Sequence, residues 1–407
     1  MHNKFFHHDL GTGNSKWPDS GALSVYTYLR ESLVLTFFLL ALLAQTSVMA
    51  TEVSFSGFMS IVGGKVLSGS RTDTFDNVQC PCFVADWTHL GVYNNDTSFS
   101  QESRAGVRMN AKVNESLTGV IQVDGRSVTG KGTLEWAYVA YTPADDWMVQ
   151  VGRKRLPIYY YSDFLDVGFA YPWVRPPPDV YGWEVDNFNG ITLAKTGHWG
   201  DWNSRVSLFI GEEESKANTM STHFYPGVTA PDLTWRDIHG ADVEFTRDWF
   251  SMRLVYIESK VDLISTSGWL IAPDPGQTDP VLPNMVGGQQ RIYGVSVNID
   301  YENWFVRSEL SLFDRWRDFG YVSKAAMAGF GYHIRDYTPM LTYVRYEDGN
   351  PYGDPNWANY HLAFSLRYDI NTTSAIKVQL DEYRELSLPD TTSGSANLLS
   401  VSFDRVF

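Results

Sequence analysis

Apolar and polar residues alternate one by one along much of this chain, and most clearly at its end. In the segment 397–407 the side chains of Leu399, Val401 and Phe403 fall on one face, whereas that of Ser402 falls on the other. A period of two predicts a β-strand with one apolar and one polar face. Such a strand suits a wall that has lipid on its outside and water on its inside.

Sixteen segments, each of roughly the ten residues that a membrane-spanning strand needs, show this alternation. They are 53–62, 103–113, 116–126, 132–142, 147–155, 188–196, 203–212, 236–247, 251–260, 289–300, 304–314, 324–334, 337–347, 357–369, 373–384 and 397–407. An even number of strands is the rule in single-chain bacterial outer-membrane barrels. The pattern therefore predicts an all-β fold, a transmembrane antiparallel β-barrel of 16 strands.

The connections between these segments alternate between short and long. The turns at 114–115, 248–250 and 301–303 are short, whereas the connections 63–102 and 156–187 each exceed 30 residues. Short periplasmic turns and longer extracellular loops are typical of outer-membrane barrels. A soluble sandwich or propeller has no reason to alternate in this way.

The third long loop, 156–187, is rich in aromatic residues and proline. An exposed apolar patch of this kind is unusual unless it packs against something. A barrel of 16 strands also leaves an aqueous channel unless a segment fills it. We therefore expect this loop to fold into the lumen and narrow it.

The basic residues of the strands share one face. In the segment 103–113, Arg104, Arg108 and Lys112 fall opposite Val107. An Arg or Lys side chain facing lipid at the bilayer midplane costs about 2–4 kcal/mol, so the basic face must line the lumen. The same alternation predicts which side chains of the later strands face the lumen, namely Arg307, Glu309, Arg345, His361, Ser365 and Arg367. It predicts that the side chains facing lipid are Val306, Leu310, Met340, Thr342, Val344, Tyr346, Leu362 and Phe364.

The first 50 residues lack the β-pattern. No apolar run reaches the ~20 residues of a transmembrane helix, and the one worth naming is 33–44. Arg30 precedes this run. After it, Val48 and Ala50 supply the small residues that stand before the cleavage site of a secretory signal peptide. We expect residues 1–50 to be an N-terminal extension plus a signal peptide cleaved after Ala50, with 1–29 upstream of the export signal, and residues 51–407 to be one barrel domain.

Charge and cysteine content exclude some other classes. The net charge of -15 argues against a nucleic-acid partner. The two cysteines, Cys80 and Cys82, lack the second pair of ligands that a structural zinc site needs, so they either pair with each other or stay unpaired. We expect neither a metal nor a cofactor.

An export signal, 16 alternating strands, a long third loop after the fifth strand and a terminal phenylalanine together resemble the general porins of Gram-negative bacteria. In that family the third loop narrows the barrel, its acidic groups face a ladder of arginines on the wall, and three barrels associate. The resemblance implies a homotrimer in the outer membrane, in contact with lipid and lipopolysaccharide, through which small hydrophilic solutes and ions diffuse passively. The terminal aromatic residue, here Phe407, serves in that family as a signal to the barrel-assembly machinery.

Carried over to this chain, the resemblance implies two opposed charge sets. The wall ladder would be Arg104, Arg108, Arg126, Arg307, Arg345 and Arg367. The acidic loop residues would be Asp163, Asp166, Asp179, Glu184 and Asp186. The alternative for each arginine is an ion pair with a wall carboxylate such as Glu135, Asp242, Glu244 or Glu309. Two departures from the family pattern are the missing Pro-Glu-Phe-Gly-Gly sequence in the third loop and the short second loop.

Two other functions compete with a general pore. Stacked aromatic faces in the third loop would suit a sugar-specific porin, and the candidates are Tyr159, Tyr160, Tyr161, Trp173, Tyr181 and Trp183. A barrel enzyme would need a nucleophile beside a base. His361 and Ser365 lie about 13 Å apart along a strand, too far for that role, and no Gly-x-Ser-x-Gly or His-Glu-x-x-His motif occurs. We therefore expect no enzymatic activity.

Overall fold

The structure is a computed structural model that describes residues 52–407 except 72–73, 76–77, 225–229, 272–281, 353–354 and 387–393. The expected extension and signal peptide lie outside the described residues.

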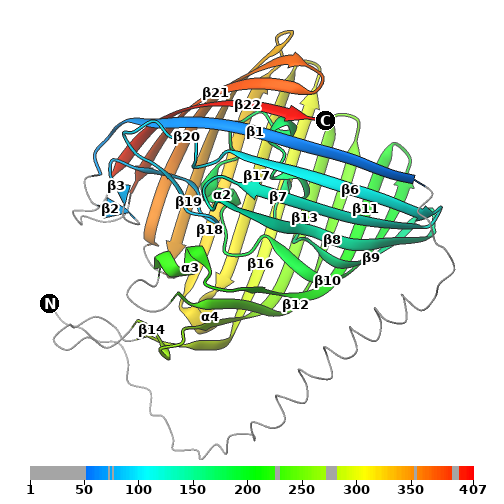
Figure 1. Ribbon diagram of the computed structural model, residues 1–407, viewed down its shortest axis with the longest axis horizontal. Helices are drawn as coiled ribbons and strands as arrows, with labels where there is room; N and C mark the ends of the chain where they lie inside the picture. The colour runs from blue at the N-terminus through cyan, green and yellow to red at the C-terminus, as the bar shows by residue number, and fades with distance from the viewer. Residues whose placement is uncertain are drawn as a thin grey trace, which may run out of the picture. The chain divides into compact units, whose positions relative to one another are not determined.

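Sixteen antiparallel strands close into one barrel (Figure 1). They are β1 (Glu52–Gly69), β6 (Arg104–Asn114), β7 (Leu117–Arg126), β8 (Lys131–Ala144), β9 (Trp147–Arg155), β10 (Asn187–Trp199), β11 (Trp202–Ser215), β12 (Asp232–Arg247), β13 (Phe250–Ile264), β16 (Met285–Tyr301), β17 (Trp304–Arg315), β18 (Tyr321–Tyr332), β19 (Tyr337–Gly349), β20 (Pro355–Asn371), β21 (Ser374–Glu385) and β22 (Ser395–Val406). Each predicted segment overlaps one of these strands, so the predicted fold class is confirmed.

The two ends of the chain's barrel segment meet and close the ring. β22 pairs antiparallel with β1, with Val406 opposite Phe58 and Phe403 opposite Ile61. Beyond β22, Phe407 and Gly57 exchange two backbone hydrogen bonds, of 2.8 and 3.0 Å. The last strand therefore seals the barrel as the sequence predicted.

The short connections join neighbouring strands at one end of the barrel, and the long ones lie at the other end. The long connections carry the remaining elements, which are β2 (Thr74–Phe75), β3 (Val78–Gln79), β4 (Phe83–Asp86), β5 (Gly91–Tyr93), η1 (Ser162–Phe164), η2 (Gly168–Ala170), α2 (Pro178–Tyr181), α3 (Thr219–Phe224), β14 (Trp269–Ile271), β15 (Leu282–Pro283) and α4 (Trp316–Phe319). None of the helices in the described ranges has the length and apolarity needed to cross a membrane.

The two faces of the strands differ as predicted. Leu310 and Phe364 are exposed on the outer face, whereas Gln379, Ser400 and Asp404 are buried on the inner face. The outer surface therefore presents apolar side chains, and the polar side chains of the strands point into the lumen.

β19 is the exception, and its predicted parity is wrong. Met340, Thr342 and Val344 are at most 1% exposed, whereas Leu341 and Tyr343 are 50% and 49% exposed. The Trp173 indole nitrogen donates to Thr342 Oγ1 at 2.8 Å, which places Thr342 on the lumen side. Here the lumen holds an apolar segment of protein rather than water, so apolar wall residues point inward and the parity reverses.

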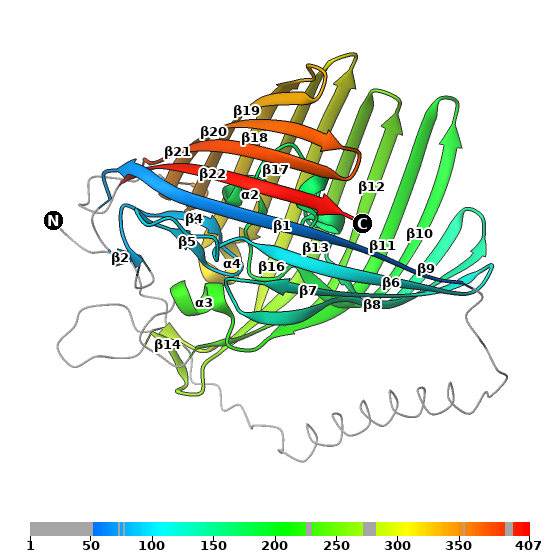
Figure 2. The ribbon, with the colours of Figure 1, turned by 45° about the horizontal axis from the view of Figure 1, so that its top comes forward.

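Two long loops, loop 1 (residues 70–103) and loop 3 (residues 156–186), fold into the barrel. A further long connection, residues 216–231, is called loop 4. Figure 2 shows α2 of loop 3 inside the ring of strands, with β4 and β5 of loop 1 nearby. Apolar residues of loop 3 and of the wall from β10 to β19 form one buried cluster. The predicted insertion of the third loop is confirmed, whereas the insertion of loop 1 was not predicted.

Candidate functional site

Loop 3 fills part of the lumen with packed rings. The Tyr161 ring lies at the centre, with its centroid 5.7 Å from that of Trp173 and 6.0 Å from that of Tyr181. The Trp183 ring packs on Phe313 of β17 with centroids 4.0 Å apart. Five of the six aromatic residues considered for sugar stacking are buried, Tyr159, Tyr161, Trp173, Tyr181 and Trp183. The expectation that they form an exposed stacking face is wrong, because their rings form the loop's own hydrophobic core.

Asp166 of loop 3 is at the centre of a cluster of contacts with three wall arginines, which we call the Asp166 cluster. Its two carboxylate oxygens pair with Arg126 of β7 and Arg155 of β9. The Arg104 Nε of β6 donates to the Asp166 carbonyl oxygen at 2.7 Å. Burial alone would raise the pKa of Asp166, but the charges of Arg155 and Arg126 outweigh it and hold this pKa below its ordinary value of 3.8.

The Asp166 cluster predicts how the attachment of loop 3 to the wall depends on pH. Because the pKa of Asp166 is lower in the folded loop than in a free one, its stabilising contribution is fully present above pH 3.8 and is lost as pH falls below that value. We expect the single-channel current to be steady from about pH 8 to 5 and to become noisy only below about pH 4. Bilayer recordings across this range test it, and loop noise that begins at neutral pH would contradict it.

A second set of contacts fixes the middle of loop 3 to β20 and β21, on the other side of the seam between β1 and β22. Lys377 Nζ of β21 donates to the carbonyl oxygens of Gly168 and Trp173 at 2.6 and 2.7 Å and lies 3.1 Å from Asp404. Arg367 Nη1 of β20 donates to the Phe169 carbonyl at 2.6 Å. A Cβ atom at Gly168 would collide with the Asp404 carboxylate and the Ser60 hydroxyl, so only glycine allows this close approach.

The other acidic residues of loop 3 are also engaged, with one exception. Glu184 forms a two-point ion pair with Arg315 of β17, with distances of 3.0 and 2.6 Å. Asp179 lies 3.0 Å from the Nδ1 atom of His361. Asp186 pairs with Arg155 at 3.0 Å. These carboxylates therefore anchor the loop instead of facing water.

Asp163 is the exception, because it does not anchor the loop. We call the space between Asp163 and the wall cations on which it acts electrostatically the gap. In the part of the chain that the structure describes Asp163 has no ion pair, and it lies half-buried in η1. Its charge acts electrostatically on Arg108 of β6, Lys154 of β9 and Arg205 of β11. Three strands thus present cations opposite a single loop carboxylate.

The three cations differ in how strongly they are paired. Arg108 donates to Gln122 Oε1 at 2.9 and 2.7 Å and stacks 3.9 Å above the Trp136 ring. Lys154 Nζ donates to Gln150 Oε1 at 2.7 Å. Neither cation has a carboxylate partner among the described residues, whereas Arg205 lies 3.4 Å from the carboxylates of Asp242 and Glu244. The charge of Arg205 is thus compensated by two carboxylates of the barrel wall, as in the ion-pair alternative considered for the wall arginines.

The predicted arginine ladder consequently divides into four groups. Arg104, Arg126 and Arg367 contact loop 3 directly and hold it. Arg307 pairs with Asp300 at 2.6 Å beside the short turn that follows β16. The placement of Arg345 in the lumen is wrong, since it shares the outer face of β19 with Tyr343 and pairs there with Glu347 at 2.9 Å. Arg108 is the ladder residue that faces the gap.

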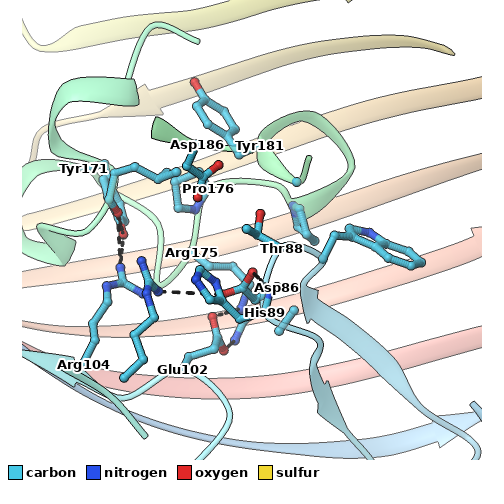
Figure 3. Close-up of a pocket in the computed structure, with 16 residues that line it drawn as sticks. Asp86, Thr88, His89, Glu102, Arg104, Tyr171, Arg175, Pro176, Tyr181 and Asp186 are labelled. Carbon is cyan, nitrogen blue, oxygen red and sulfur yellow. Dashed lines mark hydrogen bonds and ion pairs between the residues drawn. The ribbon is translucent and has the colours of Figure 1, made fainter. Parts of the chain in front are cut away.

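Loop 1 packs onto loop 3 and adds charges of its own to the lumen. Arg175 of loop 3 donates to both carboxylate oxygens of Glu102 in loop 1, at 2.7 and 2.6 Å (Figure 3). It also donates to Asp381 of β21 at 2.6 Å. The hydroxyl of Thr88 donates to the Trp183 carbonyl at 2.8 Å. Cys80 and Cys82 in the first half of loop 1 form a disulfide, one of the two alternatives that the sequence left open.

Sequence reasoning missed most of the residues that fix the two loops. They are Arg155, Arg175, Arg253, Arg315 and Lys377, together with Lys154 and Arg205 at the gap. The alternation of β11 and β21 could have placed Arg205 and Lys377 on the inner face. Arg175 lies in irregular backbone, where no periodicity predicts a direction.

His361 and Ser365, the pair considered for catalysis, do not lie as a base beside a nucleophile. His361 is held between Asp179 at 3.0 Å and Asp381 at 2.9 Å, so both of its ring nitrogens are engaged. Ser365 is buried on the same strand and has no hydrogen bond to His361. No group of three or more His, Cys, Asp or Glu side chains in the described ranges is arranged to hold a metal ion.

Comparison with known proteins shows a shared fold. Neither a protein-family model nor a curated protein sequence matches the chain. A loop L8 deletion mutant of OmpT, an outer membrane protein of Vibrio cholerae, is 12% identical, with a TM-score of 0.56 over 88% of this chain and 100% of that chain. OmpF of Salmonella typhi, in complex with daunomycin, is 11% identical, with a TM-score of 0.53 over 88% of this chain and 98% of that chain.

A third solved structure agrees with these two. OprB of Pseudomonas putida at high pH is 10% identical, with a TM-score of 0.51 over 87% of this chain and 94% of that chain. At such identities the likeness concerns the fold alone. The chain therefore has the fold of the outer-membrane β-barrels.

Proposed function

We propose that this chain is a porin, a water-filled channel through which small hydrophilic solutes and ions diffuse passively across the outer membrane of a Gram-negative bacterium. The observation that carries the proposal is a closed barrel with an apolar outside and a charged inner gap between Asp163 and the wall. Export by a signal peptide with its apolar region at 33–44, insertion by the barrel-assembly machinery through Phe407, and contact with lipid and lipopolysaccharide belong to the same proposal. So does assembly into a homotrimer.

The gap favours passage over catalysis. Among the described residues, Arg108 and Lys154 on one side have amide hydrogen-bond partners but no carboxylate partner, and Asp163 on the other side has no ion pair. Opposed charges along a polar gap orient dipolar solutes and disfavour apolar ones, as charged rings do in other pores. The chain is therefore proposed to act without catalysing a reaction.

The charge count of the gap predicts a modest preference for anions. Two cations without a carboxylate partner face one carboxylate, while Arg205 is paired by its own wall. The acidic net charge of the whole chain is spread over loops and turns, where water and salt screen it. The unpaired charges of the gap therefore dominate the selectivity.

Reversal potentials in planar bilayers test this proposal. In a tenfold salt gradient, where ideal selectivity gives about 59 mV, we expect a small anion-selective potential. The double variant Arg108→Gln plus Lys154→Gln is expected to move it by about 10–20 mV toward cation selectivity, and Asp163→Asn to move it the opposite way.

Lys195→Gln is the matched control, because Lys195 lies on the outer face and is half-exposed. It is expected to leave the reversal potential unchanged. A barrel that conducts no current would contradict the proposed function itself. A current whose selectivity ignores Arg108, Lys154 and Asp163 would contradict the role given to the gap.

A further inference from the structure

Two uncharged side chains hold Arg108, the ladder arginine at the gap. Arg108 of β6 stands directly opposite Gln122 of β7, and Gln122 stands directly opposite Trp136 of β8. The guanidinium reaches across Gln122 to the Trp136 ring, with its Cζ atom 3.9 Å from the ring centroid. Its Nε and Nη2 atoms both donate to Gln122 Oε1, at 2.9 and 2.7 Å. The side chain of Arg108 is therefore fixed at two places, by residues of the next two strands.

The amide group of Gln122 is itself fixed in one orientation. Its Nε2 atom donates to both carboxylate oxygens of Asp124, at 3.1 and 3.2 Å, and both residues are at most 2% exposed. A flipped amide would set its NH2 group against the guanidinium of Arg108 and its oxygen against the carboxylate of Asp124, so repulsive contacts would replace the hydrogen bonds. Gly106 stands opposite Asp124, where a Cβ atom would collide with the carboxylate. The oxygen of the Gln122 amide therefore faces Arg108.

Gln122 holds Arg108 without compensating its charge. Arg205, on the same inner wall, is held by two carboxylates, which offset its charge. An amide oxygen accepts the same hydrogen bonds but carries no net charge. The Trp136 ring attracts the guanidinium through its quadrupole and also adds no net charge. The contacts of Arg108 thus fix its position and leave its charge to the gap.

We propose that Gln122 and Trp136 are positioning residues of the gap, which keep the charge of Arg108 apart from that of Asp163. Asp163 acts electrostatically on Arg108, and opposite charges across an aqueous space attract each other. An arginine side chain that was free to rotate would move toward this carboxylate, and the resulting ion pair would cancel both charges. Held against β7 and β8, Arg108 stays available to anions that pass. The inference rests on the proposed function, because it concerns the ion selectivity of the same gap.

Reversal potentials of two uncharged variants test this inference. Gln122→Met removes the amide at similar volume, and Trp136→Leu removes the ring, while neither changes the net charge of the chain. Each is expected to shift the reversal potential toward cation selectivity, by about half of the shift that Arg108→Gln produces. In the Arg108→Gln background the same two substitutions should cause no further shift, because residues that act through one another are not additive.

Gln289→Met is the matched control, since Gln289 lies in β16 and contacts Arg317 of α4. It should leave the reversal potential unchanged. No shift in either variant, a shift of equal size in the Arg108→Gln background, or an equal shift with Gln289→Met would each overturn the inference. A barrel of unchanged sequence that conducts no current would contradict the proposed function, whereas a conducting barrel that fails one of these comparisons contradicts the positioning role alone.

Discussion

Replacing Asp166 by asparagine is expected to free loop 3 from the wall and to raise the single-channel conductance. The carboxylate pairs with Arg126 and Arg155, whose side chains are at most 9% exposed. Removing one partner of a buried ion pair costs about 3–5 kcal/mol when the remaining charge is left uncompensated. Arg155 keeps its ion pair with Asp186 at 3.0 Å, so we expect a smaller cost of about 2–3 kcal/mol. A cost of this size shifts the balance between seated and released loop by a factor of about 30 or more.

Single-channel recording in planar bilayers measures this effect directly. We expect Asp166→Asn to give a larger and noisier current than the unchanged protein, while the strand pairing of the barrel keeps it folded in detergent. Asp201→Asn is the matched control, because it removes the same charge from a side chain that is 74% exposed in the short turn between β10 and β11. If Asp166→Asn left conductance and noise unchanged, or if both variants changed them equally, the anchoring role of Asp166 would be wrong.

Arg175→Leu is expected to have the second large effect, the release of loop 1 from loop 3. Arg175 joins Glu102 of loop 1 to Asp381 of the wall, and all three side chains are at most 3% exposed. Without the guanidinium, the buried Glu102 carboxylate loses its ion-pair partner, whereas Asp381 keeps its contact with His361 at 2.9 Å. Leaving a buried charge unpaired costs about 3–5 kcal/mol. Loop 1 should then become accessible to added protease in the folded barrel.

Limited proteolysis in detergent, followed by identification of the cleaved bond, measures this release. Arg317→Leu provides the control, because Arg317 belongs to the exposed helix α4 and contacts Gln289 there. A double variant with Glu102→Leu added to Arg175→Leu should regain protection, since apolar groups can replace a buried ion pair at little cost, and Asp381 keeps its contact with His361. Protection of loop 1 in Arg175→Leu that equals the control would refute this account.

Much of the fold could be predicted because each membrane-spanning strand is specified locally. Alternation along 397–407 predicted both a strand and its lipid-facing side, and the same rule located the other fifteen. The rule holds because lipid outside and polar groups inside demand opposite chemistry on adjacent residues. It failed at β19, where Met340 and Val344 face the apolar surface of loop 3 instead of water.

For the candidate site, the sequence predicted the charged residues but not their contacts. The sequence supplied loop 3, its acidic residues and the wall arginines, but not which charges would pair. Asp163 and Asp166 are three residues apart and chemically identical, yet one faces the gap and the other is held by Arg126 and Arg155. That difference depends on the path of irregular backbone, which has no period from which directions can be derived.

The sequence by itself therefore determined the barrel: its sixteen strands, its closure by β22 on β1, and the loop that enters it. Alternation along a strand is a local property, and lipid enforces it residue by residue. Only the tertiary structure decided how the lumen is divided, with loop 1 packed on loop 3, Arg345 outside, and Arg108 and Lys154 facing Asp163. Those outcomes depend on contacts between segments that are distant in sequence, and on which buried charges find partners once the barrel has closed.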